Sequence, residues 1–283
     1  MDAKTVLLES LDARWKKLRA ELKICRNEFS EEAVHDLRVA TRRLLALFDL
    51  LRVLIPRKRV QKIRRALKDQ LDELDDLRDT QVLLADVSEF IQDIPELKTF
   101  QERLQKNEKT YLRHTRKAIR SRKTSGLTKR IDKIREMIES LPADSLREST
   151  LTAADERFAR VLQTYAAMDT ENIPSIHKLR VAFKKFRYTV EIVHPLLENF
   201  PAENFERMHN YQSMMGDIQD LEVASEQLTE FKDTASQTDF EPAANHYASR
   251  LRTAVLRFVE DKGEALTFWR NTPDGSFPWE KPL

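Results

Sequence analysis

Residues 34–51, VHDLRVATRRLLALFDLL, contain the pattern that decides the fold, because basic and apolar residues recur there with the period of an α-helix. At about 100° per residue, His35, Arg38 and Arg42 fall on one face of such a helix and Leu44 falls on the opposite face. The stretch therefore predicts an amphipathic helix that buries its apolar face and presents a cationic one.

Residues 176–193, IHKLRVAFKKFRYTVEIV, repeat this pattern 142 positions further along the chain. The matched pairs are His35 with His177, Arg38 with Arg180, Arg42 with Lys184, and Arg43 with Lys185. A second echo follows at an offset of 141, between LDDLRDTQV at 74–82 and MGDIQDLEV at 215–223. A weaker third echo, RW at 14–15 and RF at 157–158, precedes the motifs. Echoes in the same order and register indicate an internal duplication.

The duplication and the composition together predict an all-α fold of two four-helix-bundle-like halves related by a pseudo-twofold axis. Only 4 of 283 residues are glycine and 34% are charged, which is typical of long helices. We expect one domain over 1–283, with a first bundle at about 1–142, a second at about 143–270, and an irregular tail at 271–283. Apolar periodicity and helix-breaking prolines predict helices near 3–27, 31–55, 58–78, 80–92, 96–122, 127–140, 145–168, 175–194, 202–217, 219–232 and 242–268.

Charge is segregated along the chain although the net charge is only +2. Between positions 38 and 65 there are ten bases and one acid, whereas 69–79 and 217–241 are acidic. Such a chain can present a strong local positive field while it stays nearly neutral overall. The single cysteine, Cys25, excludes an internal disulfide and a cysteine-built metal site. Because no run of about 18 apolar residues occurs, we expect no membrane segment and a cytoplasmic location.

The two cationic faces have few carboxylates four residues away, the spacing at which helical charges pair. Bases this close repel one another unless an anion neutralises them, and Arg, Lys and His all donate to phosphate oxygens. We therefore expect a multiply anionic, extended ligand. The basic run at 113–123 either extends the ligand track or is merely solvated. The candidate binding residues are His35, Arg38, Arg42, Arg43, Lys62, Arg65, Arg116, Arg120, His177, Arg180, Lys184, Lys185, Arg187 and Arg207.

The two motifs, HDLRVATRR at 35–43 and HKLRVAFKK at 177–185, resemble those of the CHAD domains, the conserved histidine α-helical domains. LDDLRD and MGDIQD look like that family's downstream turn signature, with Asp75 standing where the second copy has Gly216. The resemblance spans the whole chain. It implies two pseudo-symmetric bundles around a basic channel or groove that binds inorganic polyphosphate. It also implies partners among polyphosphate granules or polyphosphate-metabolising enzymes. We expect no cofactor, no metal and no catalysis.

Two alternative functions would use the same basic faces. Nucleic-acid binding is disfavoured because few aromatic residues accompany them, Phe186 and Tyr188 being the nearest. A metal-dependent polyphosphatase is less favoured still, because no clustered carboxylates share the histidine face. Asp79 and Asp220 are interpreted as N-caps of the helices that follow them, in preference to metal ligands or general bases.

Overall fold

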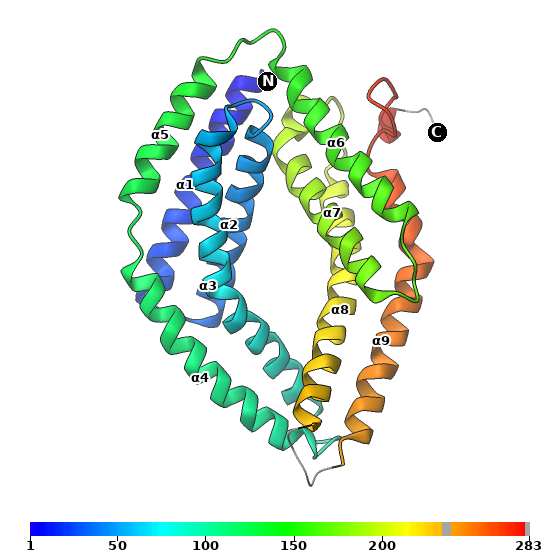
Figure 1. Ribbon diagram of the computed structural model, residues 1–283. Coiled ribbons are helices and arrows are strands. Elements are labelled where there is room, and N and C mark those ends of the chain that lie inside the picture. Colours follow the sequence, from blue (N-terminus) through cyan, green and yellow to red (C-terminus); the bar gives the residue numbers. More distant parts are fainter. Residues whose placement is uncertain (234–238, 281–283) are drawn as a thin grey trace.

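The computed structural model describes residues 1–233 and 239–280, and this part of the chain contains helices and no strand. The all-α fold is therefore confirmed. Figure 1 shows two groups of helices side by side, one running from blue to green and the other from green to orange. The first group is α1 (Ala3–Asn27), α2 (Glu31–Leu51), α3 (Arg57–Phe90), α4 (Leu97–Ser121) and α5 (Ser125–Glu139). The second is α6 (Leu146–Ala166), α7 (Ile173–Val193), α8 (Glu203–Lys232) and α9 (Glu241–Asp261), with short 3-10 helices η1 (His194–Leu196), η2 (Lys262–Thr267) and η3 (Pro278–Glu280).

The two motif helices begin where the sequence provides start signals. Ser30 caps α2, because its side chain accepts a hydrogen bond from the Ala33 backbone N–H at 3.1 Å. Glu31 in the first turn adds a favourable interaction with the helix dipole. Pro174 lies in the first turn of α7, where its missing N–H has no helical partner to lose. These signals place both motif histidines about one turn inside their helices.

α3 and α8 each continue as one helix through a position where the sequence analysis predicted a break. The expected boundaries at 78–80 and 217–219 are wrong, and Asp79 and Asp220 are not N-caps. No proline interrupts either segment, and clustered acids alone do not end a helix. The LDDLRD and MGDIQD segments are consequently helical, and their carboxylates lie in helix interiors. The matched segments occupy α2 and α3 in one half and α7 and α8 in the other, while the duplication itself stays a prediction.

The C-terminal segment packs against the second half. The predicted last helix ends at Asp261 rather than at 268 and is followed by η2. Trp269 is only 1% exposed, and its indole N–H donates to Asp155 of α6 at 2.8 Å. The Phe277 ring lies 4.9 Å from the Trp269 ring. Residues 271–280 are irregular apart from η3, and 281–283 lie outside the described residues.

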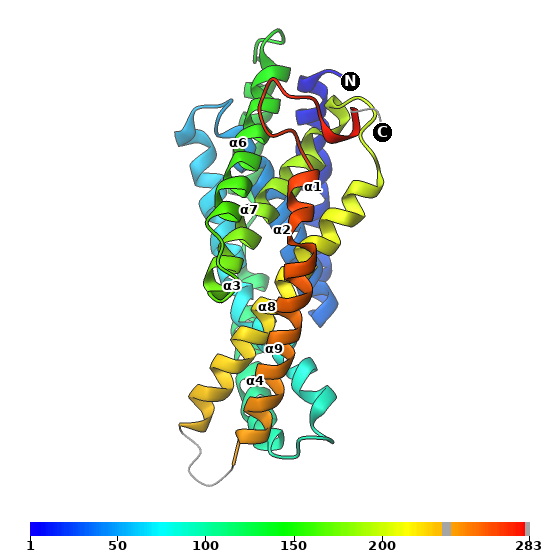
Figure 2. The same ribbon diagram turned by 90° about the vertical axis from the view of Figure 1, so that its right-hand side faces the viewer.

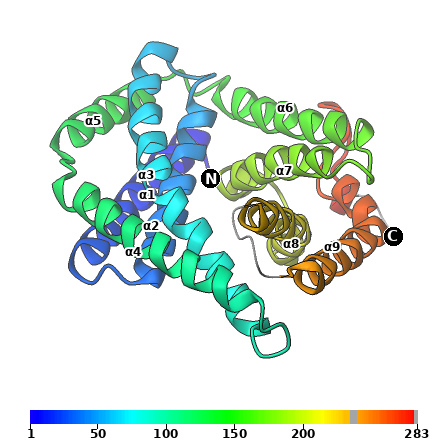
Figure 3. The same cartoon turned by 60° about the horizontal axis from the view of Figure 1, so that its bottom comes forward.

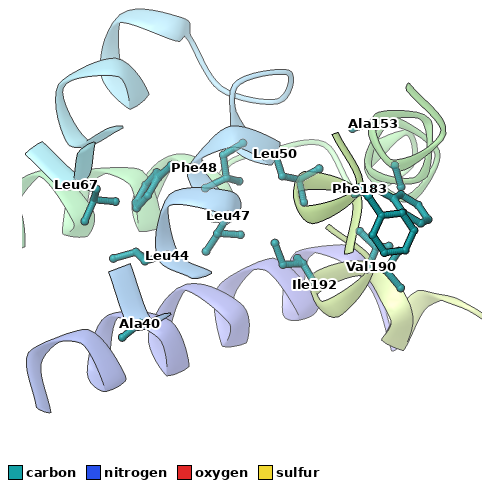
Figure 4. Close-up of a cluster of buried hydrophobic side chains, with 14 of the residues drawn as sticks. Ala40, Leu44, Leu47, Phe48, Leu50, Leu67, Ala153, Phe183, Val190 and Ile192 are labelled. Atoms are coloured by element: carbon teal, nitrogen blue, oxygen red, sulfur yellow. The ribbon is translucent and has the colours of Figure 1, made fainter. Parts of the chain in front are cut away.

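Two hydrophobic clusters join the halves at two different places. The larger one includes residues of α1, α2, α6 and α7, and Figure 4 shows Leu47 and Leu50 of α2 together with Phe183 and Ile192 of α7. A smaller cluster gathers the far ends of α3 and α4 with α8 and α9, through residues such as Val87. Figures 1 and 2 show these far ends at the bottom of the molecule, which comes forward in Figure 3. The two halves therefore contact each other at two separate places.

The contact at the far ends also has a polar component. Asp86 of α3 accepts hydrogen bonds from the Tyr247 hydroxyl at 2.8 Å and from the Arg250 guanidinium at 2.7 and 3.0 Å, both on α9. The Arg250 guanidinium also lies 4.5 Å from the centroid of the Phe90 ring. A carboxylate that accepts from two partners across the interface specifies one relative placement of the halves.

Candidate anion-binding site

The cationic faces of α2 and α7 meet where these two helices pack against each other. The charge of Arg42 lies close enough to lower the pKa of three other bases there, and we call the four the central basic cluster: Arg38, Arg42, Arg180 and Lys184. Burial lowers the pKa of Lys184 to about 7, and the charges of the three arginines add to this decrease. The two halves of the chain thus pool positive charge at one place.

Arg38 is held in this cluster by α3. It is 5% exposed and forms an ion pair with Asp75. Asp79 lies one turn further along α3; burial raises the pKa of its carboxyl, and the charge of Arg38 opposes that increase. The acidic residues that the sequence analysis interpreted as features of a turn therefore serve as counter-charges to the motif arginine.

Arg180 has the corresponding place on α7 with a different environment. Its guanidinium lies over Gly216 of α8, where an added Cβ would meet Arg180 Nη2 at 3.4 Å. Burial lowers the pKa of Arg180, and the charge of Asp220 opposes the decrease. Arg180 has no ion pair within 4 Å among the described residues, and its Nε is buried without a hydrogen-bond partner. A buried donor of this kind is costly until an acceptor reaches it.

The motif histidines flank the cluster. His35 is exposed, and its pKa is lowered by partial burial and by the charge of Arg78. His177 is half-buried, its pKa is lowered by burial and by the charge of Arg180, and its Nδ1 is buried without a hydrogen-bond partner. The cluster and its flank thus contain two buried nitrogen atoms without a hydrogen-bond partner, Arg180 Nε and His177 Nδ1.

A cavity of about 160 Å³ opens beside Arg42 and Lys184. Its lining is partly cationic, with Arg157 and Lys185 in addition to those two bases. The rest is largely apolar and comes from Leu45, Ala46, Leu71, Tyr188 and Thr189, with one acid, Asp49. Space of this size next to the cluster leaves room for a phosphate-sized group beside the cationic side chains.

The sequence model of the CHAD domain family matches residues 9–229, which is well over half of the chain. The chain belongs to the CHAD domain family. The expected identification is therefore confirmed. No curated protein sequence matches this CHAD domain significantly.

Solved structures show the same fold. The crystal structure of the CHAD domain from the plant Ricinus communis has a TM-score of 0.66 and 18% sequence identity, over 95% of this chain and 92% of that one. PptA from Streptomyces chartreusis has a TM-score of 0.68 and 16% identity, over 92% of this chain and 99% of that one. At such identities the likeness establishes the architecture of this CHAD domain and says nothing further about its ligand.

Other candidate residues on α2 and α7 of the CHAD domain lie around the cluster and are partly neutralised. Arg43 is half-exposed and its Nε lies 3.4 Å from a Glu191 oxygen. Arg187 donates to Glu191 at 2.8 Å and to Gln212 at 3.0 Å, and it stacks over the ring of Tyr188. Lys185 is exposed and lines the cavity. These bases can add to the local field, but each except Lys185 already has a partner.

The remaining candidates are not brought into the cluster. Arg207 donates to Glu264, Asn204 and Thr267 and stacks on Phe268, so its contacts are with the C-terminal segment and its own helix. The other four are exposed on α3 or α4: Lys62, Arg65, Arg116 and Arg120. Their participation in ligand binding stays a prediction, as does that of the 113–123 run.

The sequence analysis missed Arg78 and Arg157. Arg157 lines the cavity and donates to the Asp49 carbonyl at 3.2 Å. Arg157 stands in the RF segment at 157–158, which matches RW at 14–15, and this repetition could have identified it as a candidate. Arg78 pairs with Glu31 at 2.6 Å and lies near His35. Its position one helix away from the histidine could not be inferred from spacing along the chain.

The described residues contain no group of three or more His, Cys, Asp or Glu side chains placed to hold a metal ion. Within the same part of the chain, none of the helices combines the length and the apolar character that crossing a membrane requires.

Proposed function

We propose that this CHAD domain binds inorganic polyphosphate through the central basic cluster and does not catalyse a reaction on it. The observation that carries the proposal is the incomplete neutralisation of this cluster. Arg42 and Lys184, from different halves, have no ion pair among the residues that the structure describes. Like charges held together in this way favour the bound state of a multiply charged anion.

The chemistry of the donors favours phosphate oxygens. Arg42 has a planar fork that matches two oxygens of one phosphate, whereas Lys184 offers a compact charge. Arg180 Nε, a buried donor without a partner, gains an acceptor when such a ligand enters. Bases continue outward from the cluster to Arg43 and Lys185, which favours an extended anion over a single phosphate.

Nucleic acid is the less favoured ligand because base stacking is poorly provided for. Tyr188, an aromatic residue of the cavity wall, is 8% exposed and is covered by the guanidinium of Arg187 at 4.7 Å. Proteins that bind single strands present exposed aromatic faces to the bases. Competition for the site between polyphosphate and RNA at fixed salt distinguishes these two ligands.

The test is a double substitution of the two unpaired cluster bases, Arg42→Gln with Lys184→Gln. A pair of exposed bases outside the cluster, Lys133→Gln with Arg252→Gln, makes the same change in net charge. Arg38 and Arg180 are avoided because removal of Arg38 would leave Asp75 without its partner. Titration with long-chain polyphosphate is carried out at several salt concentrations, with folding checked by circular dichroism.

We expect the cluster variant to bind polyphosphate at least about tenfold more weakly, since each lost charge-assisted hydrogen bond contributes roughly 1.5–3 kcal/mol. The slope of log affinity against log salt should also decrease in magnitude by about one to two. The proposal is rejected if the control pair weakens binding as much as the cluster pair. It is also rejected if RNA displaces polyphosphate at equal phosphate concentration, or if phosphate is released when magnesium or manganese is present.

A further inference from the structure

We propose that Lys184 is a covalent modification site whose amine accepts the acyl group of small acyl phosphates, the mixed anhydrides of carboxylic and phosphoric acids. This inference concerns the reactivity of one side chain and does not depend on polyphosphate binding. It rests on the side chains around Lys184 Nζ and on the two-sided lining of the adjoining cavity.

The cavity has walls suited to both parts of an acyl phosphate. Arg42 and Arg157 supply positive charge for the phosphate, whereas Leu45 and Leu71 supply apolar surface for a short acyl chain. Its volume of about 160 Å³ corresponds to roughly five molecules of liquid water. A small acyl phosphate fits this space, and a polymer would have to extend beyond it.

The surroundings of Lys184 favour the neutral, nucleophilic form of its amine. Arg38 and Arg42 of α2 and Arg180 of α7 face it, and the opposing charge comes from Asp75 of α3. Lys184 forms no hydrogen bond or ion pair with other described residues. Burial and the three arginines lower the pKa of the amine to about 7, which is the standard way to activate a lysine.

The reaction is a simple acyl transfer. The lone pair of Lys184 Nζ attacks the carbonyl carbon and a C–N bond forms. The bond between that carbon and the bridging phosphate oxygen breaks, and phosphate leaves with the electron pair. Arg42, which helps to lower the pKa of the amine and also lines the cavity, stabilises the leaving phosphate. The extra proton on nitrogen passes to solvent, and the product is an uncharged amide.

Lys185 is an internal reference, because it is the next residue of α7 and its side chain is exposed. At pH 7.5, about three quarters of an amine with a pKa near 7 is neutral. Lower basicity reduces nucleophilicity and offsets part of this advantage. We expect Lys184 to react roughly tenfold faster than Lys185.

The experiment treats the whole protein with acetyl phosphate in the absence of polyphosphate, and mass spectrometry measures the initial rate at each lysine. Acetic anhydride, which carries no phosphate, is the comparison reagent. We expect the preference for Lys184 over Lys185 to be larger with acetyl phosphate, and the rate at Lys184 to level off above about pH 8. Arg42→Gln should reduce the rate at Lys184 more than the rate at Lys185.

Two results overturn the inference. One is acetylation of Lys184 by acetyl phosphate no faster than that of Lys185. The other is an equal preference with both reagents, which would mean that the cavity does not recognise the phosphate. Because polyphosphate is absent, either result leaves the proposed ligand of the protein untouched.

Discussion

Polyphosphate affinity should decrease as the pH rises through neutrality, and Lys184 should cause most of the decrease. In the free protein, partial burial and the charges of Arg42, Arg180 and Arg38 lower the pKa of Lys184 to about 7, and the charge of Asp75 opposes this decrease. A bound polyanion favours the charged amine and raises its pKa, so binding takes up a proton. Linkage then requires tighter binding below pH 7 and weaker binding above it.

The size of the effect follows from the two pKa values. If the bound anion restores the usual lysine pKa of about 10.4, affinity falls about twofold from pH 6 to 7 and about fivefold from pH 7 to 8. It then falls close to tenfold between pH 8 and 9. The pKa values of His35 and His177 are lowered from 6.5, so their titration affects affinity at lower pH.

The measurement is a series of polyphosphate titrations between pH 6 and 9 at constant ionic strength. Lys184→Arg is the matched variant, because an arginine stays protonated throughout this range. We expect its affinity to change little between pH 7 and 9. An equally steep decrease in this variant would refute the assignment to Lys184, and a flat profile in the unmodified protein would refute the linkage itself.

Three other changes should have distinct effects. Asp79→Asn with Asp220→Asn removes two carboxylates near Arg38 and Arg180 and should tighten polyphosphate binding about threefold or more. Weaker binding in a titration would mean that the two carboxylates position these arginines for the ligand. Asp155→Ala leaves the Trp269 indole and the Arg270 guanidinium without their shared acceptor. It should lower the free energy of unfolding, measured by urea denaturation, by about 3–5 kcal/mol. An unchanged midpoint of the urea transition would contradict this role of Asp155. Asp86→Ala removes the acceptor that joins α3 to α9, and should speed amide hydrogen exchange at these far ends while exchange in the centre of α2 stays unchanged.

The sequence determined the features that depend on local pattern. The period of the two motifs predicted which faces of α2 and α7 are cationic, and Ser30 and Pro174 marked the starts of helices. The amphipathic pattern also implied that the apolar faces pack together, since a helix must bury its apolar face. The spacing of the two motifs alone marks four residues as candidate ligand contacts: Arg38, Arg42, Arg180 and Lys184.

Features that depend on contacts between distant segments could not be obtained in this way. The acidic pattern around Asp79 resembles a helix boundary, because the nearby charge of Arg38 comes from another helix and cannot be found from local spacing. Arg207 was selected for its charge, yet residues about 60 positions later, such as Glu264, already bind it. Arg157 reaches the cavity only because α6 packs against α7.

The two sides of the site are unequal, because Asp75 stands in the LDDLRD segment at the position that Gly216 has in the MGDIQD segment. On one side Arg38 forms an ion pair with the Asp75 carboxylate. On the other side Arg180 lies over Gly216, and the Nε of Arg180 has no hydrogen-bond partner. A linear ligand with identical ends therefore loses its own symmetry when it binds. Phosphorus atoms that are equivalent in a free short chain should therefore give separate resonances in the complex.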